Sequence, residues 1–142
     1  MKSRILSLSL FLLGLSAVGI GLAIIGFGPD KTVRFFASII DLFGGAKMPI
    51  TDFDSVNVDS EFRFYSVFWV AYGAFLIQTS RDLSQYGQRV PLLLGLFFLG
   101  GLSRLLSYIT YGAPHTLFNV LLVIEITVPV ILYLLFRKTA RS

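Results

Sequence analysis

The chain contains no cysteine and only one histidine among its 142 residues. The absence of cysteine excludes disulfides, thiolate metal sites, cysteine nucleophiles and thiol redox relays. A single histidine leaves no set of imidazole ligands for a multi-histidine metal centre. The sequence therefore predicts neither a bound metal nor a cofactor.

Charged residues are also scarce. Only 14% of the residues are charged and 55% are hydrophobic, whereas soluble domains carry about 25% charged residues. A water-soluble fold of this size does not bury so much apolar surface, because small domains have a high ratio of surface to volume. We expect residues 1–142 to form a single transmembrane domain. The net charge of +4 then serves membrane topology, and no nucleic-acid partner is expected.

Four apolar stretches are each about 20 residues long, the length that an α-helix rising ~1.5 Å per residue needs to cross ~30 Å of hydrocarbon. They span residues 5–27, 62–79, 90–109 and 116–136. All four are continuous and do not alternate as barrel strands do. The first is far longer than the ~7–15-residue core of a signal peptide, so we expect it to be retained. The predicted fold class is all-α, an integral membrane four-helix bundle.

Basic residues indicate how these helices are oriented. Segments 1–4, 80–89 and 137–142 together carry seven basic residues and one acid, whereas residues 30–63 carry four basic residues and six acids. Basic residues concentrate on the cytoplasmic side of membrane proteins. Both termini are therefore expected in the cytoplasm.

The first outside loop contains a further helical pattern over about residues 30–44. Polar residues recur at Lys31, Arg34, Ser38 and Asp41, with apolar residues between them. This is the periodicity of an amphipathic helix. We expect this extra helix to lie in the outer membrane interface, or to fold back over the bundle and cap it, and the two placements are compatible.

The rest of this loop, residues 46–60, is predicted to be irregular, with Asp59 or Ser60 as the N-cap of the second membrane helix. Its acidic and amide side chains raise the question of a calcium site. They are Asp52, Asp54, Asn57 and Asp59. The segment lacks the central glycine and the closing glutamate of an EF-hand loop, so a solvated loop is favoured over a metal site.

Small residues recur four positions apart in the first helix. Ala17 with Gly21, and Gly19 with Ala23, would let a neighbouring helix approach closely. We expect this packing to occur within one molecule, with homodimerisation through the first helix as the alternative.

Two charged residues lie inside otherwise apolar spans, where each costs ~2.5–3.5 kcal/mol. Arg104 is predicted about 7–8 Å below the outer surface on the third helix, and Glu125 about 13–14 Å below it on the fourth. A long arginine side chain covers most of this difference in depth. The geometry therefore allows an ion pair between Arg104 and Glu125, and the sequence leaves open whether Arg104 meets Glu125, Glu61 or neither.

Other polar residues gather in the same outer half of the predicted bundle. His115 and Asn119 share one face of the fourth helix, and further polar residues open the second helix. We predict that three helices bring these side chains to one level and form a ligand-binding site. Its predicted members are Glu61, Arg63, Arg104, His115, Asn119 and Glu125. The alternative is an architectural pair of Arg104 and Glu125, with the other residues solvated at the rim.

Three segments carry a resemblance to a known family. They are Ser60–Tyr65 (SEFRFY), Phe98–Leu105 (FLGGLSRL) and Gly112–His115 (GAPH), the last followed by Glu125. Through them, residues 59–138 resemble a family of small bacterial membrane proteins catalogued as a domain of unknown function. The resemblance implies a four-helix, multi-pass protein of the bacterial inner (plasma) membrane, and it implies no activity.

These observations favour a protein that binds a membrane lipid or a lipophilic small molecule in an outward-facing polar pocket, with Arg104 contacting an anionic group. One alternative is a small membrane enzyme in which Glu125 and His115 transfer protons, although no nucleophile–base pattern supports catalysis. Another is an accessory subunit of a larger membrane complex. A homo-oligomer is compatible with each of these functions.

Overall fold

The computed structural model of the protein describes residues 2–44 and 49–140, which are predominantly helical. The elements are α1 (Lys2–Phe27), α2 (Pro29–Asp41), α3 (Val56–Arg81), α4 (Leu83–Tyr86), the 3₁₀-helix η1 (Gly87–Arg89), α5 (Val90–Tyr111) and α6 (Thr116–Ala140). No strand occurs in the two described ranges. The predicted all-α fold class is therefore confirmed.

Three helical segments are long and apolar enough to cross a membrane, namely Arg4–Phe27, Leu83–Tyr111 and Thr116–Thr139. They contain the first, third and fourth predicted spans. The second predicted span lies within α3, which has 26 residues and is therefore about 39 Å long. Charged and amide residues near its ends, such as Asp59, Arg63 and Gln78, make α3 less apolar than the other three long helices.

α3 begins earlier in the chain than the sequence predicts. It starts at Val56, and the Ser55 hydroxyl accepts a hydrogen bond from the Val58 backbone N–H at 3.3 Å. The prediction that Asp59 or Ser60 caps this helix is therefore wrong. A helix extends beyond its apolar span when an upstream serine satisfies one of its first N–H groups.

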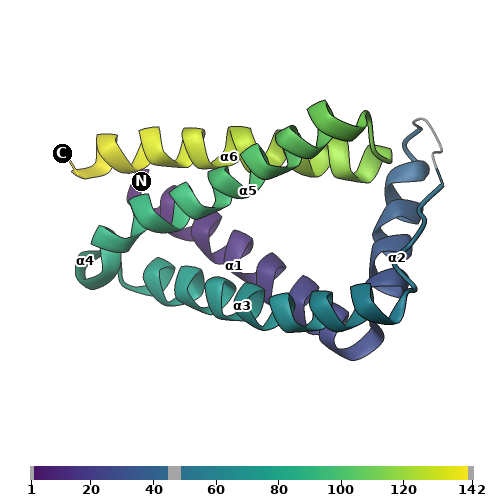
Figure 1. The fold of residues 1–142 in the computed structure, drawn as a ribbon. Helices are drawn as coiled ribbons and strands as arrows, with labels where there is room; N and C mark the ends of the chain where they lie inside the picture. Colours follow the sequence, from purple (N-terminus) through teal and green to yellow (C-terminus); the bar gives the residue numbers. More distant parts are fainter. Residues whose placement is uncertain (1, 45–48, 141–142) are drawn as a thin grey trace.

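The amphipathic helix predicted in the first loop is confirmed as α2, with Pro29 in its first turn. Gly28 precedes it at a positive φ of 87°, and Gly44 follows it at 86°, conformations that favour glycine. α2 buries Thr32 and Ala37 and contacts α1, α3 and α6. Figure 1 shows it crossing one end of the molecule, opposite the end where α1 begins and α6 ends. The capping role is therefore confirmed.

The long helices associate as two pairs, α1 with α3 and α5 with α6. In the first pair the backbones nearly touch, since a Cβ atom at Gly14 would lie 2.7 Å from the Gly73 carbonyl oxygen. Gly21 likewise faces the Ser66 carbonyl oxygen, at 3.1 Å from a built Cβ, whereas a Cβ at Gly19 would meet nothing within 4 Å. The prediction that small residues of the first helix pack within the molecule is thus confirmed for Gly21.

The buried apolar core lies toward the end of the molecule where α1 begins. It joins α1, α3, α5 and α6 through Leu6, Leu10, Leu76, Val90, Leu94 and Leu132. The Tyr72 hydroxyl donates a hydrogen bond to the Leu93 carbonyl oxygen at 2.9 Å and so links α3 to α5. The core holds the two helix pairs together at this end, and the predicted polar residues lie beyond it.

Candidate functional site

The two charged residues within apolar spans form an ion pair, one of the arrangements that the sequence left open. The Arg104 Nε atom of α5 lies 2.7 Å from the Glu125 Oε2 atom of α6. The Glu125 side chain is 7% exposed and the Arg104 side chain 37%. Pairing offsets part of the cost of burying the carboxylate in apolar surroundings.

A glycine of α5 makes room for Glu125. A Cβ atom at Gly101 would lie 3.0 Å from the Glu125 Cβ and 2.9 Å from the Ile126 Cδ1. A Cβ at the neighbouring Gly100 would lie 4.0 Å from the Glu125 Oε2, which is an ordinary contact. The close approach of α5 and α6 at Gly101 therefore depends on the missing side chain, and it brings the carboxylate within reach of Arg104.

A cavity of about 340 Å³, here called the interhelical cavity, lies beside this ion pair. All four long helices contribute to its lining. Apolar and aromatic side chains form most of the wall, among them Ile20, Phe62, Tyr65, Trp69, Phe97 and Leu121. Arg104 and Glu125 also line it, so the cavity combines a largely apolar wall with one charged pair.

A second depression of about 380 Å³, here called the α5–α6 pocket, lies where these two helices diverge. Its polar lining comes from Ser103, Ser107, Tyr108 and Asn119, and Arg104 borders it as well as the interhelical cavity. The Asn119 Nδ2 atom donates to a backbone carbonyl at 3.3 Å. Its Oδ1 atom is buried and has no hydrogen-bond partner within the described residues.

Arg104 keeps donors free after pairing with Glu125. A guanidinium group has five N–H donors, and the hydrogen bond to Glu125 uses only the one on Nε. Among the residues that the structure describes, the two terminal nitrogens have no hydrogen-bond partner. The guanidinium carbon lies 5.9 Å from the centroid of the Phe118 ring. Arg104 can therefore donate to a further anionic or carbonyl oxygen.

The structure does not bring Glu61 and Arg63 into this arrangement. Arg63 Nε lies 2.7 Å from Asp59 Oδ2, and its Nη1 donates to the Ile25 carbonyl oxygen near the end of α1. Glu61 is exposed and lines neither depression. Arg63 and Asp59 instead flank Gly28, where a Cβ atom would lie 3.0 Å from Asp59 Oδ1. These two residues thus fasten the corner between α1 and α2.

His115 contacts α2 and not the ion pair. Its Nδ1 atom accepts a hydrogen bond from the Leu117 backbone N–H at 3.1 Å, and its Nε2 atom lies 3.3 Å from Asp41 Oδ1. The Nε2 atom of His115 is not aligned for a hydrogen bond to Asp41, because Asp41 Oδ1 has no hydrogen-bond partner among the described residues. His115 is buried and lines neither depression. It therefore docks the end of α2 against the start of α6.

Comparison with known proteins places this arrangement in a family. A family model described as "Domain of unknown function (DUF4345)" matches residues 5–136. The chain belongs to the DUF4345 family. The match covers almost the whole of α1 and α6 and all of α2, α3 and α5, which confirms the family that the sequence resembles. No curated protein and no solved structure matches the chain.

Sequence reasoning missed several residues around the DUF4345 ion pair. Tyr65, Ser66 and Trp69 of α3 line the interhelical cavity, although none of them was predicted as a member of the site. Asp41 was predicted as a polar position of the amphipathic helix, not as the neighbour of His115. The acidic side chain at the last residue of α2 could have indicated a contact there, but the sequence did not show that the contact would be with His115.

The residues around Arg104 are chemically suited to binding a ligand. An arginine with free donors stands at the wall of a largely apolar cavity, and a buried amide oxygen lies in the adjoining α5–α6 pocket. Such a combination suits a ligand with an apolar body and one polar group. Glu125 is oriented toward Arg104, so its carboxylate holds the guanidinium in place.

Proposed function

We propose that this DUF4345 protein is a four-helix protein of the bacterial inner membrane that binds a lipid or lipophilic small molecule in the interhelical cavity. In this proposal α1, α3, α5 and α6 cross the membrane, both termini are cytoplasmic, and Arg104 binds the polar group of the ligand. Three segments that are long and apolar enough to span a membrane support the insertion. The excess of basic residues in the segments that hold the termini supports the orientation.

One observation carries the proposal. Arg104 lies in an apolar span at the wall of the interhelical cavity, and its terminal nitrogens have no partner among the described residues. A purely architectural arginine in hydrocarbon is expected to satisfy most of its donors within the protein, because each unsatisfied polar group is costly there. Free donors on a residue that lines a largely apolar cavity are better explained by a ligand that completes them.

The cavity limits the size of the ligand. Its volume of about 340 Å³ lies at the lower end of the ~300–1,000 Å³ range of small-molecule sites. It therefore fits a small lipophilic molecule or one segment of an acyl chain. The polar group would be an anion or a carbonyl, since arginine has donors only.

The enzyme alternative receives no support from the geometry. His115 and Glu125 are ten positions apart, which corresponds to about 15 Å along a helix. His115 lines neither depression and lies against α2. Proton transfer needs groups within hydrogen-bond reach of a shared substrate, and these two residues share no cavity.

Native mass spectrometry of the gently solubilised protein tests the binding. Arg104→Ala alone would leave Glu125 buried without a partner and would destabilise the fold. The double variant Arg104→Leu/Glu125→Leu removes both charges and is expected to fold, because apolar replacement of a buried pair is often neutral or stabilising. We expect wild type to retain a bound molecule and the folded double variant to lose it. Equal retention by the double variant would refute the role of Arg104.

A second pair of variants tests the location. Leu96 of α5 lines the interhelical cavity, whereas Leu92, one turn earlier on the same helix, lines none of the depressions described here. Both side chains are exposed, by 50% and 65%. Leu96→Trp is expected to fill the cavity and displace the ligand, and Leu92→Trp is expected to leave it bound. If both variants keep the ligand, it binds elsewhere.

Membrane topology can be tested because the chain has no cysteine. Thr51→Cys lies in the exposed segment before α3, and Gln88→Cys lies in the exposed turn before α5. A membrane-impermeant maleimide is expected to label Thr51→Cys in intact cells and Gln88→Cys only after lysis. Labelling of Gln88→Cys in intact cells would contradict the proposed orientation.

A further inference from the structure

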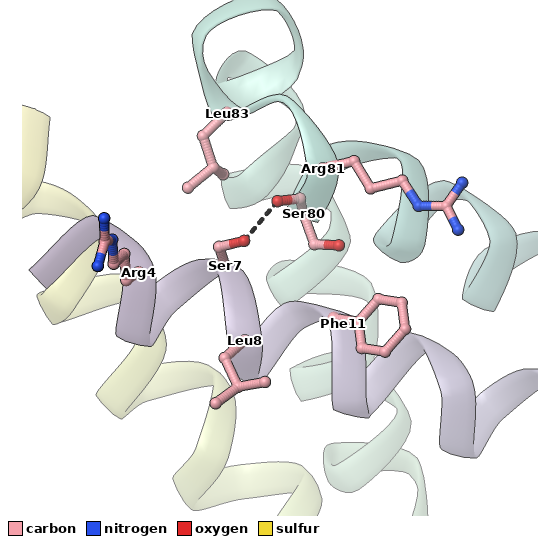
Figure 2. A pocket seen from close by; sticks show the side chains of 7 residues that line it. All are labelled: Arg4, Ser7, Leu8, Phe11, Ser80, Arg81 and Leu83. Atoms are coloured by element: carbon pink, nitrogen blue, oxygen red, sulfur yellow. Dashed lines mark hydrogen bonds between the residues drawn. The ribbon is translucent and has the colours of Figure 1, made fainter. Parts of the chain in front are cut away.

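A groove of about 460 Å³, here called the terminal groove, lies at the opposite end of the molecule from α2. It is formed by the start of α1, the end of α3 and the start of α4. Figure 2 shows Arg4 and Arg81 on either side of a hydrogen bond from the Ser7 hydroxyl to the Ser80 carbonyl oxygen. This hydrogen bond joins α1 to α3 and forms part of the groove wall.

The two arginines of the terminal groove carry uncompensated charge. Among the described residues neither Arg4 nor Arg81 forms an ion pair, and the groove lining contains no acidic side chain. The neighbouring carboxylate of Asp82 accepts hydrogen bonds from the Ser84 N–H and hydroxyl and from the Gln85 N–H. Asp82 thus caps α4 and is engaged away from the arginines. Two positively charged residues from two helices therefore border one groove, and Figure 2 shows the Arg81 side chain extending away from Arg4.

The groove also has an apolar side. Leu8, which is 59% exposed, and Phe11 line it on α1 one and two turns after Arg4. The apolar segment able to cross a membrane begins at Arg4 itself. In an inserted protein, Arg4 therefore lies at the level where hydrocarbon gives way to headgroups, and Leu8 and Phe11 lie at the level of the acyl chains.

We propose that the terminal groove binds the phosphate of an anionic phospholipid from the leaflet that faces the protein's termini. In this proposal Arg4 donates to the phosphate oxygens, and the exposed Arg81 side chain turns toward the groove to donate from the other side, since guanidinium groups match phosphate geometry. The acyl chains of the same lipid lie along Leu8 and Phe11. This site is separate from the interhelical cavity, and it rests on the membrane insertion proposed above.

Basic residues at the cytoplasmic ends of helices also set the orientation of a membrane protein. The experiment must therefore separate lipid binding from this effect on orientation. Arg137 provides the matched control, because it lies at the same end of the molecule in the last turn of α6 and does not line the groove. Topology depends on the sum of basic residues at this end, and loss of any one arginine changes that sum equally. Only a specific site distinguishes Arg4 and Arg81 from Arg137.

The experiment uses the full chain in nanodiscs of equal parts phosphatidylglycerol and phosphatidylcholine, released for native mass spectrometry. Wild type and Arg137→Gln are expected to retain phosphatidylglycerol in preference to phosphatidylcholine. Arg4→Gln and Arg81→Gln, which each remove one charge as Arg137→Gln does, are each expected to lower the preference by about fivefold more than Arg137→Gln, and the double variant by up to about 25-fold more. Millimolar inorganic phosphate is expected not to displace the lipid, because it makes no contact with Leu8 and Phe11.

Several results would overturn the inference. They are an equal preference in the double variant and wild type, an equal loss in Arg137→Gln, or displacement of the lipid by inorganic phosphate, which would make the groove a site for free phosphate. Failure of the chain to enter nanodiscs would refute the membrane insertion and this inference together. Arg104→Leu/Glu125→Leu is expected to keep the lipid preference, so loss of ligand from the interhelical cavity and loss of lipid from the terminal groove are separate outcomes.

Discussion

Gly14→Ala tests the contact on which the α1–α3 pair depends. A Cβ atom at this position would lie 2.7 Å from the Gly73 carbonyl oxygen and 3.0 Å from the Ile77 backbone nitrogen. Both neighbours are backbone atoms, which no change of rotamer can move away. The helices must therefore separate or shift, and α1 loses contacts with α3 along the crossing.

The expected cost is that of overpacking a well-packed core by one methyl group, about 1–3 kcal/mol. At about 4 °C per kcal/mol for a domain of this size, the midpoint of thermal unfolding falls by about 4–12 °C. Thermal unfolding of the purified protein in detergent, followed by circular dichroism at 222 nm, measures this change. Gly19→Ala is the matched control on the same helix, since its Cβ would meet nothing within 4 Å.

The comparison of the two alanine variants tests whether the backbones of α1 and α3 are in contact at Gly14. Gly14→Ala is expected to lower the unfolding midpoint and Gly19→Ala to leave it unchanged or slightly raised, because alanine has the higher helix propensity. Equal midpoints for the two variants would refute the backbone contact. Combining Gly14→Ala with Gly73→Ala is expected to cost less than the sum of the single changes, because both act on one crossing.

Three further predictions concern other parts of the molecule. Gly101→Ala is expected to displace the buried carboxylate and reduce ligand retention in native mass spectrometry, whereas Gly95→Ala, whose Cβ would meet nothing within 4 Å, is expected to leave retention unchanged. Tyr72→Phe removes the hydroxyl that donates a hydrogen bond to a carbonyl of α5. This change is expected to lower the free energy of unfolding by denaturant by about 1 kcal/mol. An unchanged unfolding midpoint would show that this hydrogen bond is not stabilising. The Ser84 hydroxyl, followed by backbone N–H donors, lowers the pKa of Asp82, so the stability from this cap is present above the ~3.9 of an unfolded aspartate and is lost as pH falls through the lower folded value. The difference in unfolding midpoint between wild type and Asp82→Ala is therefore expected to narrow as pH falls below about 4, and a constant difference would contradict this assignment.

The features that sequence reasoning predicted correctly depend on local patterns. Continuous apolar stretches of about 20 residues predict long helices, and these are α1, α3, α5 and α6. The amphipathic period over residues 30–44 predicts α2. Arg104 and Glu125 were identified because charge in an apolar span is costly enough to require a partner, and the ion pair is present.

The errors arose where a group had more than one possible partner. Asp59 was predicted to cap α3, but Ser55 takes that position and Asp59 pairs with Arg63. Arg63 and His115 were predicted to join Arg104, but they meet Asp59 and Asp41 instead. A sequence states which side chains need partners, and several carboxylates within reach in the chain satisfy that need equally well.

By itself, then, the sequence determined the helices, the amphipathic helix of the first loop and the need of two charges in apolar spans for partners, because helical period and the cost of buried charge act over one or two turns. Only the tertiary structure decided that Arg104 pairs with Glu125. It also decided that four helices enclose a cavity beside Arg104 and that Arg4 and Arg81 share a groove at the other end. The shape of an empty space depends on how glycine contacts such as Gly14 with Gly73 set the distance between helices. That distance is fixed by atoms far apart in the chain, and no local pattern encodes it.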